Sequence, residues 1–201
     1  MMTKDSILQA AIAMLYQKGI LHFSLNEFLQ SNHISKGSFY HFFKDKDTLV
    51  YEALCKDNQS YRYKIEKELY ACKNLEEKFY KVFEVYCVDS AHNRQLCKIY
   101  EDMFVYAVAS QNTLFARYLE NVKEHTHYLI LQSIETAHIG RVRQAKMRDL
   151  SPMLSFGLDG FWLMLGVIGK TWEERKAEIE GFIKALCAIV TPQKTNMKGV
   201  L

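Results

Sequence analysis

The stretch SLNEFLQSNHISKGSFYHFFKDK, residues 24–46, predicts two short helices joined by a tight turn. Ser24 and Glu27 have the spacing of a capping box, in which the serine hydroxyl accepts from a free backbone N–H and the glutamate reaches back to the cap. Asn32 and His33 interrupt the helical pattern, and asparagine in particular tolerates a left-handed turn. Helical spacing places on the inward faces Leu25, Phe28, Leu29, Ile34, Phe39 and Phe42 or Phe43.

The outward side of the second helix carries the residue types that read duplex DNA. A lysine supplies charge to a phosphate or a guanine edge, a glycine lets the backbone approach closely, and serine, tyrosine and histidine offer hydrogen bonds. Second helices of such pairs lie in the major groove, and Lys46 at the start of the next helix is placed to hold a phosphate. The predicted DNA-binding residues are Ser24, Asn26, Ser35, Lys36, Gly37, Ser38, Tyr40, His41 and Lys46.

The segment SKGSFYHFFKDKDTL, residues 35–49, resembles the recognition helix and the start of the following helix in the tetracycline-repressor (TetR/AcrR) family. The family pattern is Ser-x-Gly-Thr/Ser-aromatic-Tyr-x-x-Phe-x-x-Lys-x-x-Leu. The resemblance extends upstream through the first helix and covers about residues 4–52. The positions that match the pattern are Ser35, Gly37, Ser38, Phe39, Tyr40, Phe43, Lys46 and Leu49.

The resemblance implies an all-α protein with an N-terminal helix-turn-helix domain and a C-terminal helical domain for ligand binding and dimerisation. It also implies a ligand-responsive dimeric regulator, a repressor that needs no cofactor. In such a protein a small apolar or aromatic effector binds in the helical domain, moves the long helix 46–72 and releases the palindromic double-stranded operator.

Two departures from the family pattern motivate an alternative. The family usually has Ile-Ala where this chain has Phe28-Leu29, and Ala-Gly where it has Asn32-His33. The alternative is a helical small-molecule sensor or scaffold of the same fold that does not bind an operator. A plain three-helix unit with a solvated face is less consistent with Gly37, because glycine costs a helix about 1 kcal/mol relative to alanine.

Composition agrees with a globular protein and gives a weak charge signal. The 201 residues carry a net charge of +3, and residues 1–46 contain five lysines against three acidic side chains. A dimer would double this small excess at the DNA-binding end. The five cysteines form no C-x-x-C pair, which is typical of reduced thiols. Without an export signal or a sufficiently long apolar span, we expect a cytoplasmic protein with no membrane partner.

Hydrophobic periodicity and capping signals predict about nine helices. After the helix 4–18 and the helix pair, we expect helices over about 46–72, 74–91, 94–109, 112–139, 152–168 and 171–190. Residues 141–149 read as a basic polar connection, and Pro152 as the start of the next helix. The predicted organisation is a helix-turn-helix domain over 1–46, an effector and dimerisation domain over 47–192, and a flexible tail over 193–201.

Two regions of the larger domain suggest an interface and a cavity. The helix 152–168 is apolar nearly all round, so we expect one face to meet a second subunit, with the last helix completing a four-helix contact. An internal core is the alternative. The predicted interface residues are Phe156, Gly160, Leu163, Phe182 and Leu186. Large rings mixed with Met and Cys favour a cavity in the region 75–140, and its predicted lining is Phe83, Cys87, Tyr100, Met103, Phe104 and Tyr128.

The sequence gives little support for catalysis or a metal site. His125 and His127 are two residues apart on a helix and face different directions. The spacing of Cys87 and His92 is poor for a nucleophile and its base, and no third ligand lies near Asp89 and His92. No G-x-S-x-G, H-E-x-x-H or phosphate-binding loop occurs. We therefore expect neither a catalytic nor a metal-binding residue.

Overall fold

The structure is a computed structural model that describes residues 3–87, 91–110, 113–168 and 172–189. Over these residues it contains nine helices and no strand, which confirms the predicted all-α fold. Thr171, where the last helix was predicted to begin, and the predicted tail lie outside the described residues. The helices are α1 Lys4–Lys18, α2 Leu25–Ser31, α3 Lys36–Phe42, α4 Lys46–Ala71, α5 Leu75–Cys87, α6 Ala91–Ser110, α7 Thr113–Thr136, α8 Arg141–Ile168 and α9 Trp172–Ile189.

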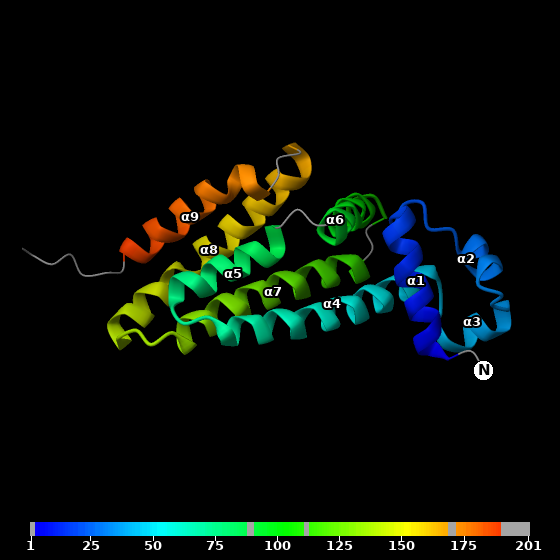
Figure 1. Cartoon of the computed structure of the whole chain (residues 1–201). Helices are drawn as coiled ribbons and strands as arrows, with labels where there is room; N and C mark the ends of the chain where they lie inside the picture. The colour runs from blue at the N-terminus through cyan, green and yellow to red at the C-terminus, as the bar shows by residue number, and fades with distance from the viewer. Residues whose placement is uncertain (1–2, 88–90, 111–112, 169–171, 190–201) are drawn as a thin grey trace, which may run out of the picture.

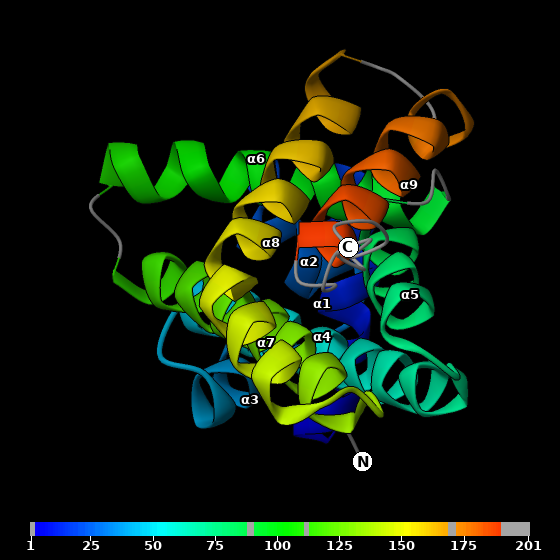
Figure 2. The same ribbon diagram turned by 90° about the vertical axis from the view of Figure 1, so that its left-hand side faces the viewer.

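The molecule is elongated, with α1–α3 at one end (Figure 1). Helix α4 starts inside this end unit and runs along the length of the molecule, next to α7. Helices α5, α8 and α9 pack on the distal half, and α6 crosses the bundle close to α1 (Figures 1 and 2). The end unit therefore packs against the start of α4 and the side of α6.

Two apolar cores stabilise this arrangement. The first joins α1–α3 to the start of α4 and includes Ile99 and Met103 of α6 and Phe115 of α7, all essentially buried. The second joins the distal half of α4 to α5, α7, α8 and α9. A three-helix unit of about fifty residues is only marginally stable alone. The shared first core therefore stabilises this unit through its contacts with the following helices.

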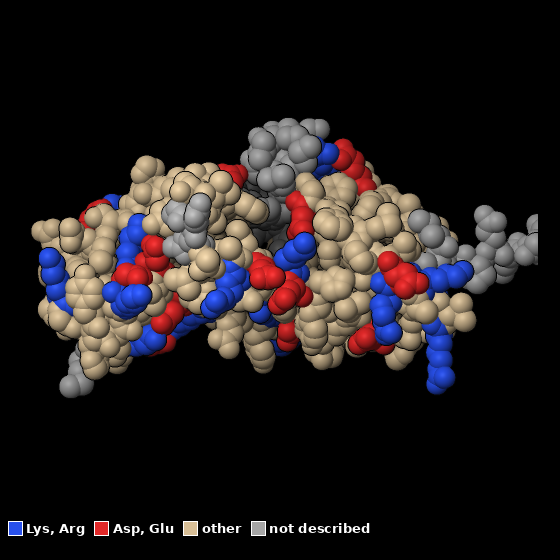
Figure 3. Space-filling model, turned by 180° about the vertical axis from the view of Figure 1, so that it is seen from behind, with Lys and Arg blue, Asp and Glu red and all other residues tan. Residues whose placement is uncertain are grey.

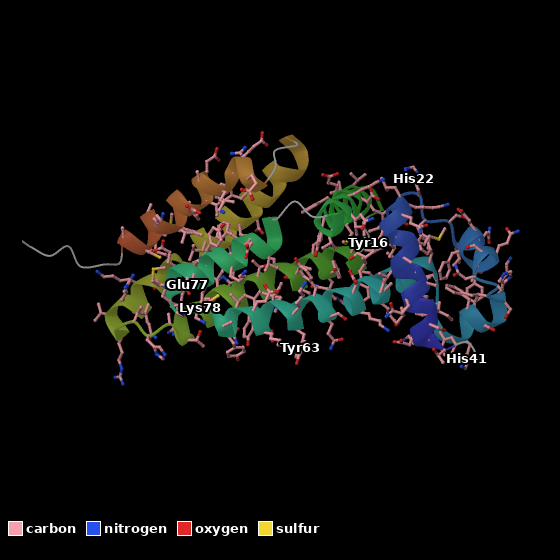
Figure 4. The ribbon with its side chains drawn as sticks, in the orientation of Figure 1. Tyr16, His22, His41, Tyr63, Glu77 and Lys78 are labelled. Atoms are coloured by element: carbon pink, nitrogen blue, oxygen red, sulfur yellow. The ribbon has the colours of Figure 1, made fainter. Side chains whose placement is uncertain are left out.

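Local caps fix several helix starts. The Thr3 hydroxyl accepts from the Ser6 N–H at 3.1 Å and so caps the start of α1. Asn74 and Glu77 form a reciprocal cap at α5, with the Glu77 N–H donating to Asn74 Oδ1 at 2.9 Å. Lys78 is buried, and its ammonium donates to the Leu69 carbonyl near the end of α4 at 2.8 Å (Figure 4). This contact ties α5 to the end of α4, where the free carbonyls favour a cation.

The prediction for residues 141–152 was wrong. Helix α8 begins at Arg141 and contains Pro152 in its interior. The polar composition of 141–149 hides a buried stripe at helical spacing, Met147, Ser151, Leu154 and Leu158. The free energy gained by packing this stripe on the second core outweighs the cost of the backbone hydrogen bond that Pro152 cannot make.

Candidate nucleic-acid interface and internal cavity

The start of α2 differs from the predicted capping box. The Ser24 hydroxyl accepts from the Glu27 N–H at 3.4 Å, so the serine half of the box is present. The Glu27 carboxylate does not return to the Ser24 backbone; it pairs with the ammonium of Lys18 at the end of α1. An exposed cation within reach competes well for this carboxylate, and the pair ties α2 to α1.

The turn between α2 and α3 places its left-handed residue one position later than expected. His33 has φ +54°, whereas Asn32 has φ −102°. The Asn32 amide instead donates to the Phe28 carbonyl at 2.9 Å, and the Ile34 N–H donates to the Leu29 carbonyl at 2.8 Å. A left-handed residue after the helix end lets the chain reverse while these carbonyls are satisfied. The position that is usually glycine in the resembling family is thus the one that adopts positive φ here.

Helix α3 is anchored by its cap and by two aromatic rings. The Ser35 hydroxyl accepts from the Ser38 N–H at 3.0 Å. The Phe39 and Phe43 rings are fully buried and stack with centroids 5.7 Å apart. Phe42 is only partly buried, so the inward residue of the predicted pair is Phe43. These contacts leave one side of α3 facing solvent.

The solvent-facing side of α3 carries the residues predicted to contact DNA. Lys36, Gly37, Ser38 and His41 are exposed, and Tyr40 is 58% exposed. A Cβ at Gly37 would meet only the Ser35 hydroxyl, at 4.0 Å, so the protein itself does not require glycine there. His41 lies at the end of the molecule that carries α1–α3 in Figure 4, and the face shown in Figure 3 has lysines and arginines mixed with acidic side chains along its whole length.

The remaining predicted contacts lie at the starts of α2 and α4. Ser24 and Asn26 are exposed. Lys46 is partly buried, with its ammonium 5.4 Å from the centre of the Tyr106 ring of α6. Asp45 caps α4 by accepting from the Thr48 N–H at 2.7 Å, a hydrogen bond that lowers the pKa of the Asp45 carboxyl. Helix α6 thus contacts the start of α4 beside the DNA-binding candidates.

A second contact from α6, which the sequence analysis missed, holds the loop between α1 and α2. Asp102 is 8% exposed, and its Oδ2 accepts from the Ile20 N–H at 2.7 Å and the Leu21 N–H at 3.3 Å. Gly19 has φ +74°, and a Cβ there would overlap the same carboxylate. His22 marks this loop in Figure 4. The sequence signal that could have indicated this contact is an acidic residue, Asp102, on the same helix face as the apolar Ile99 and Met103.

A cavity of about 810 Å³ lies between α4, α6, α7 and α8. Of the predicted lining, Tyr100 and Phe104 border it. Met103 and Phe83 are buried in the first and second cores and do not border it, Tyr128 borders a different cavity, and the Cys87 side chain lies outside the described residues. Further lining residues, not predicted, include Asp57, Tyr61, Leu96, Ala116, Arg117, Tyr118, Leu119, Lys123, Leu158 and Asp159.

One wall of this cavity connects directly to α1. The Tyr16 hydroxyl of α1 donates to the Asp57 carboxylate of α4. Burial and the neighbouring Asp57 charge raise the pKa of Tyr16 well above its ordinary value, so the phenol stays protonated. Burial also raises the pKa of Asp159 on α8. The cavity therefore combines aromatic walls with a few polar groups, an arrangement common in small-molecule sites.

The predicted interface residues divide into two groups. Phe156 of α8 is 65% exposed, and Gly160 is exposed with nothing near its Cβ position. Phe182 packs against Phe83 within the chain, and Leu186 is buried in the second core. Leu186 is thus taken up by the core of its own chain, while Phe182 is partly buried and keeps some surface exposed. The Leu163 side chain lies outside the described residues.

Comparison with known proteins agrees with the helix-turn-helix geometry. Residues 7–53 match the family model for bacterial regulatory proteins of the tetR family. The chain carries the tetR-family N-terminal domain. The match ends within α4, so it covers the three-helix unit and its continuation into the larger domain. Regulators of the tetR family act by binding DNA and are not enzymes.

Two solved structures share the whole architecture. A proposed transcriptional regulator from Pseudomonas aeruginosa PAO1 is 18% identical, with a TM-score of 0.66 over 92% of this chain and 90% of that one. A proposed TetR-family transcriptional regulator from Rhodococcus sp. is 22% identical, with a TM-score of 0.64 over 92% of this chain and 97% of that one. These similarities show that the larger domain also has the fold of tetR-family regulators.

The described part of the chain offers neither a metal-binding cluster nor a membrane span. No group of three or more His, Cys, Asp or Glu side chains there is placed to hold a metal ion. Nor is any helix of that part both long and apolar enough to cross a bilayer. Asp89 and the side chains of Cys87 and His92 fall outside the described residues.

Proposed function

We propose that this protein is a dimeric repressor that binds a palindromic operator through α3 and releases it when a small apolar or aromatic effector enters the cavity between α4, α6, α7 and α8. The observation that carries the proposal is the two-sided α3. Phe39 and the following Phe43 are buried, while Lys36, Gly37 and Tyr40 form a solvent-exposed face. Together with the match to the tetR-family model, this exposed face supports the proposal that α3 contacts base edges in the major groove of DNA.

Selection of bound duplexes from a random pool tests operator binding. We expect a palindromic sequence whose half-sites are one helical turn or a multiple apart. Its affinity should fall steeply with added salt, because phosphate contacts release counterions. A protein that selects no sequence, and binds the pool with uniform weak affinity, would instead be the helical sensor without operator binding.

Replacing Tyr40 with phenylalanine should weaken binding at all DNA sequences by on the order of tenfold, because it removes a hydrogen bond to a charged phosphate oxygen. Fluorescence anisotropy on the selected operator and on a scrambled duplex measures this. Tyr63 provides the matched control, since it is 74% exposed on the outer side of α4, far from α3 (Figure 4). Tyr63→Phe should bind as the unmodified protein does; equal losses in both variants would contradict the assignment.

Small exposed residues support a two-fold contact through α8 and α9. On α9 the exposed face carries Ala177, Gly181, Ala185 and Ala188, and on α8 Phe156 and Gly160 are exposed. Small side chains let helices approach closely, and an exposed phenylalanine gains from burial.

A Gly181→Arg substitution should therefore convert the dimer to a monomer, because a long charged side chain would stand in the contact. Sedimentation at micromolar concentration measures the change, and operator affinity should fall with it. Gly140→Arg is the control, since this glycine is also exposed with open space at its Cβ. A Gly181→Arg protein that remains dimeric would place the interface elsewhere.

Filling the cavity tests the effector site. Ala116 borders the cavity and is exposed, so tryptophan there would occupy the cavity without disturbing the core. Small aromatic compounds that bind the cavity should raise the melting temperature of the unmodified protein and lower its operator affinity. The Ala116→Trp variant should need at least a tenfold higher ligand concentration to show either effect. Ala109→Trp, exposed on α6 and outside the described cavity lining, should respond normally. An unchanged response of Ala116→Trp would contradict this site.

A further inference from the structure

A second cavity, of about 570 Å³, adjoins the first between α4 and α7. Asn58 and Tyr118 border both cavities. The second is more polar, with a guanidinium, an imidazole and several amides in its walls, and Glu124 is the only acidic residue among its described lining. Its chemistry therefore differs from that of the aromatic effector cavity.

Two side chains in this cavity have unused hydrogen-bonding atoms. Arg62 of α4 donates from Nη2 to the Asn121 carbonyl at 2.8 Å, but its buried Nε has no partner among the described residues. His125 of α7 is 8% exposed, and its buried Nε2 also lacks a partner there. Leaving such an atom unsatisfied costs about 1–3 kcal/mol, so a ligand that bonds to both would recover a substantial free energy.

The charge around these atoms favours an anion. The described ion pairs do not include Arg62, and Glu124 at the rim is exposed. Burial, followed by the Arg62 charge, lowers the pKa of His125 to about 4. The imidazole is therefore neutral at pH 7, so Arg62 carries the one positive charge among the described lining of this cavity. Tyr128 stacks on the His125 ring at 5.9 Å and fixes its orientation.

We propose that Arg62 and His125 bind a small oxyanion, a carboxylate or a phosphate group, in this second cavity. A guanidinium presents donors in a geometry that matches two oxygens of such a group. The imidazole contributes Nε2–H as a further donor. Because α4 and α7 run side by side (Figures 1 and 2), the bound anion would bridge the two helices next to the effector cavity. The proposal is independent of DNA binding.

Binding should also take up a proton. A bound anion opposes both causes that keep His125 neutral, so it raises the pKa of this side chain. The charged and titratable groups that line the cavity around His125 are Arg62 and Cys55 from α4 and Tyr118, Glu124 and Tyr128 from α7. Affinity for acetate, which itself stays ionised above pH 5.5, should therefore increase several-fold between pH 8 and pH 6.

Calorimetry of the full-length protein without DNA tests the site, with sodium acetate and sodium phosphate as probes at constant ionic strength set by chloride. We expect saturable millimolar binding of at least one probe, and proton uptake revealed by repeating the titration in buffers of different ionisation enthalpy. Binding of acetate alone identifies a carboxylate site, binding of phosphate alone a phosphate site, and binding of both a general oxyanion site. Absence of saturable binding by either probe overturns the proposal.

Variants assign the binding to the two residues. Arg62→Gln should weaken it at least tenfold, Arg62→Lys less, and His125→Gln should retain weaker binding without the pH dependence. Lys64→Gln is the control, since it removes a positive charge from an exposed position on α4. Equal affinity in Arg62→Gln and the unmodified protein overturns the proposal, as does an equal loss in Lys64→Gln.

Discussion

Gly37→Ala is expected to abolish specific operator binding while leaving the protein folded and slightly more stable. The added Cβ has room inside the protein, because the only atom it would meet is the Ser35 hydroxyl at 4.0 Å. Alanine also favours the helix over glycine by up to about 1 kcal/mol. On the DNA side, however, the methyl group would stand where the α3 backbone approaches the groove, and the displaced helix would lose several contacts of about 1–3 kcal/mol each.

A thermal melt and an anisotropy titration separate these two effects. We expect an unchanged or higher melting temperature together with a loss of operator affinity of at least a hundredfold. Gly140→Ala is the matched control, because its Cβ would also enter open space but lies between α7 and α8, away from α3. If Gly37→Ala bound the operator as tightly as the control, the α3 backbone would not lie against the duplex and the proposed reading mode would be wrong.

The sequence allowed the N-terminal unit to be predicted because its signals are local. The cap of α3 and the spacing of Phe39 and Phe43 lie within nine residues, and they determine which side of the helix is left outside. The structure differs from the prediction in only two local details, the partner of Glu27 and the position of the left-handed residue. Glu27 pairs with Lys18 of the preceding helix, and His33 takes the left-handed conformation expected near Asn32.

The larger domain was less predictable because its contacts join distant parts of the chain. Helical periodicity indicates which residues are apolar, but not how each helix is rotated against neighbours it meets only after folding. Phe83 and Phe104 are both aromatic and were both assigned to the cavity, yet Phe83 packs in a core and Phe104 borders the cavity. The hydrogen-bond acceptor of Arg62, the Asn121 carbonyl, likewise lies on α7, 59 positions further along the chain.

Removing the Asp102 carboxylate is expected to destabilise the protein and to loosen the DNA-binding unit from α6. Asp102→Ala would leave the buried N–H of Ile20 and that of Leu21 without the acceptor they now share. Each unsatisfied buried donor costs about 1–3 kcal/mol, so a loss of about 2–4 kcal/mol in the free energy of unfolding should follow. Asp102→Asn keeps one acceptor oxygen and should lose less, which separates the hydrogen bonds from side-chain volume.

Gly19 makes this contact testable by a double-mutant cycle. Gly19→Ala alone should destabilise by about 3 kcal/mol or more, because the new Cβ would overlap the Asp102 carboxylate and the backbone has φ +74°. In the Asp102→Ala background the overlap is gone and only the backbone strain remains. The two losses measured by denaturant unfolding should therefore sum to more than the loss of the double variant. Strictly additive losses would mean that the Asp102 carboxylate does not lie against the Cβ position of Gly19.

The same cycle addresses how a ligand could reach the DNA-binding unit. Asp102 lies on α6 between Tyr100 and Phe104, which border the effector cavity, so a shift of α6 would displace the carboxylate from the loop that precedes α2. If this contact transmits the signal, the Asp102→Asn variant should bind effector as tightly as the unmodified protein does. Saturating effector should, however, lower the operator affinity of the variant by a smaller factor than it lowers that of the unmodified protein. Titrating operator affinity against effector in both proteins measures that factor. An identical factor would leave the connections through α4, such as Tyr16 to Asp57, as the route of coupling.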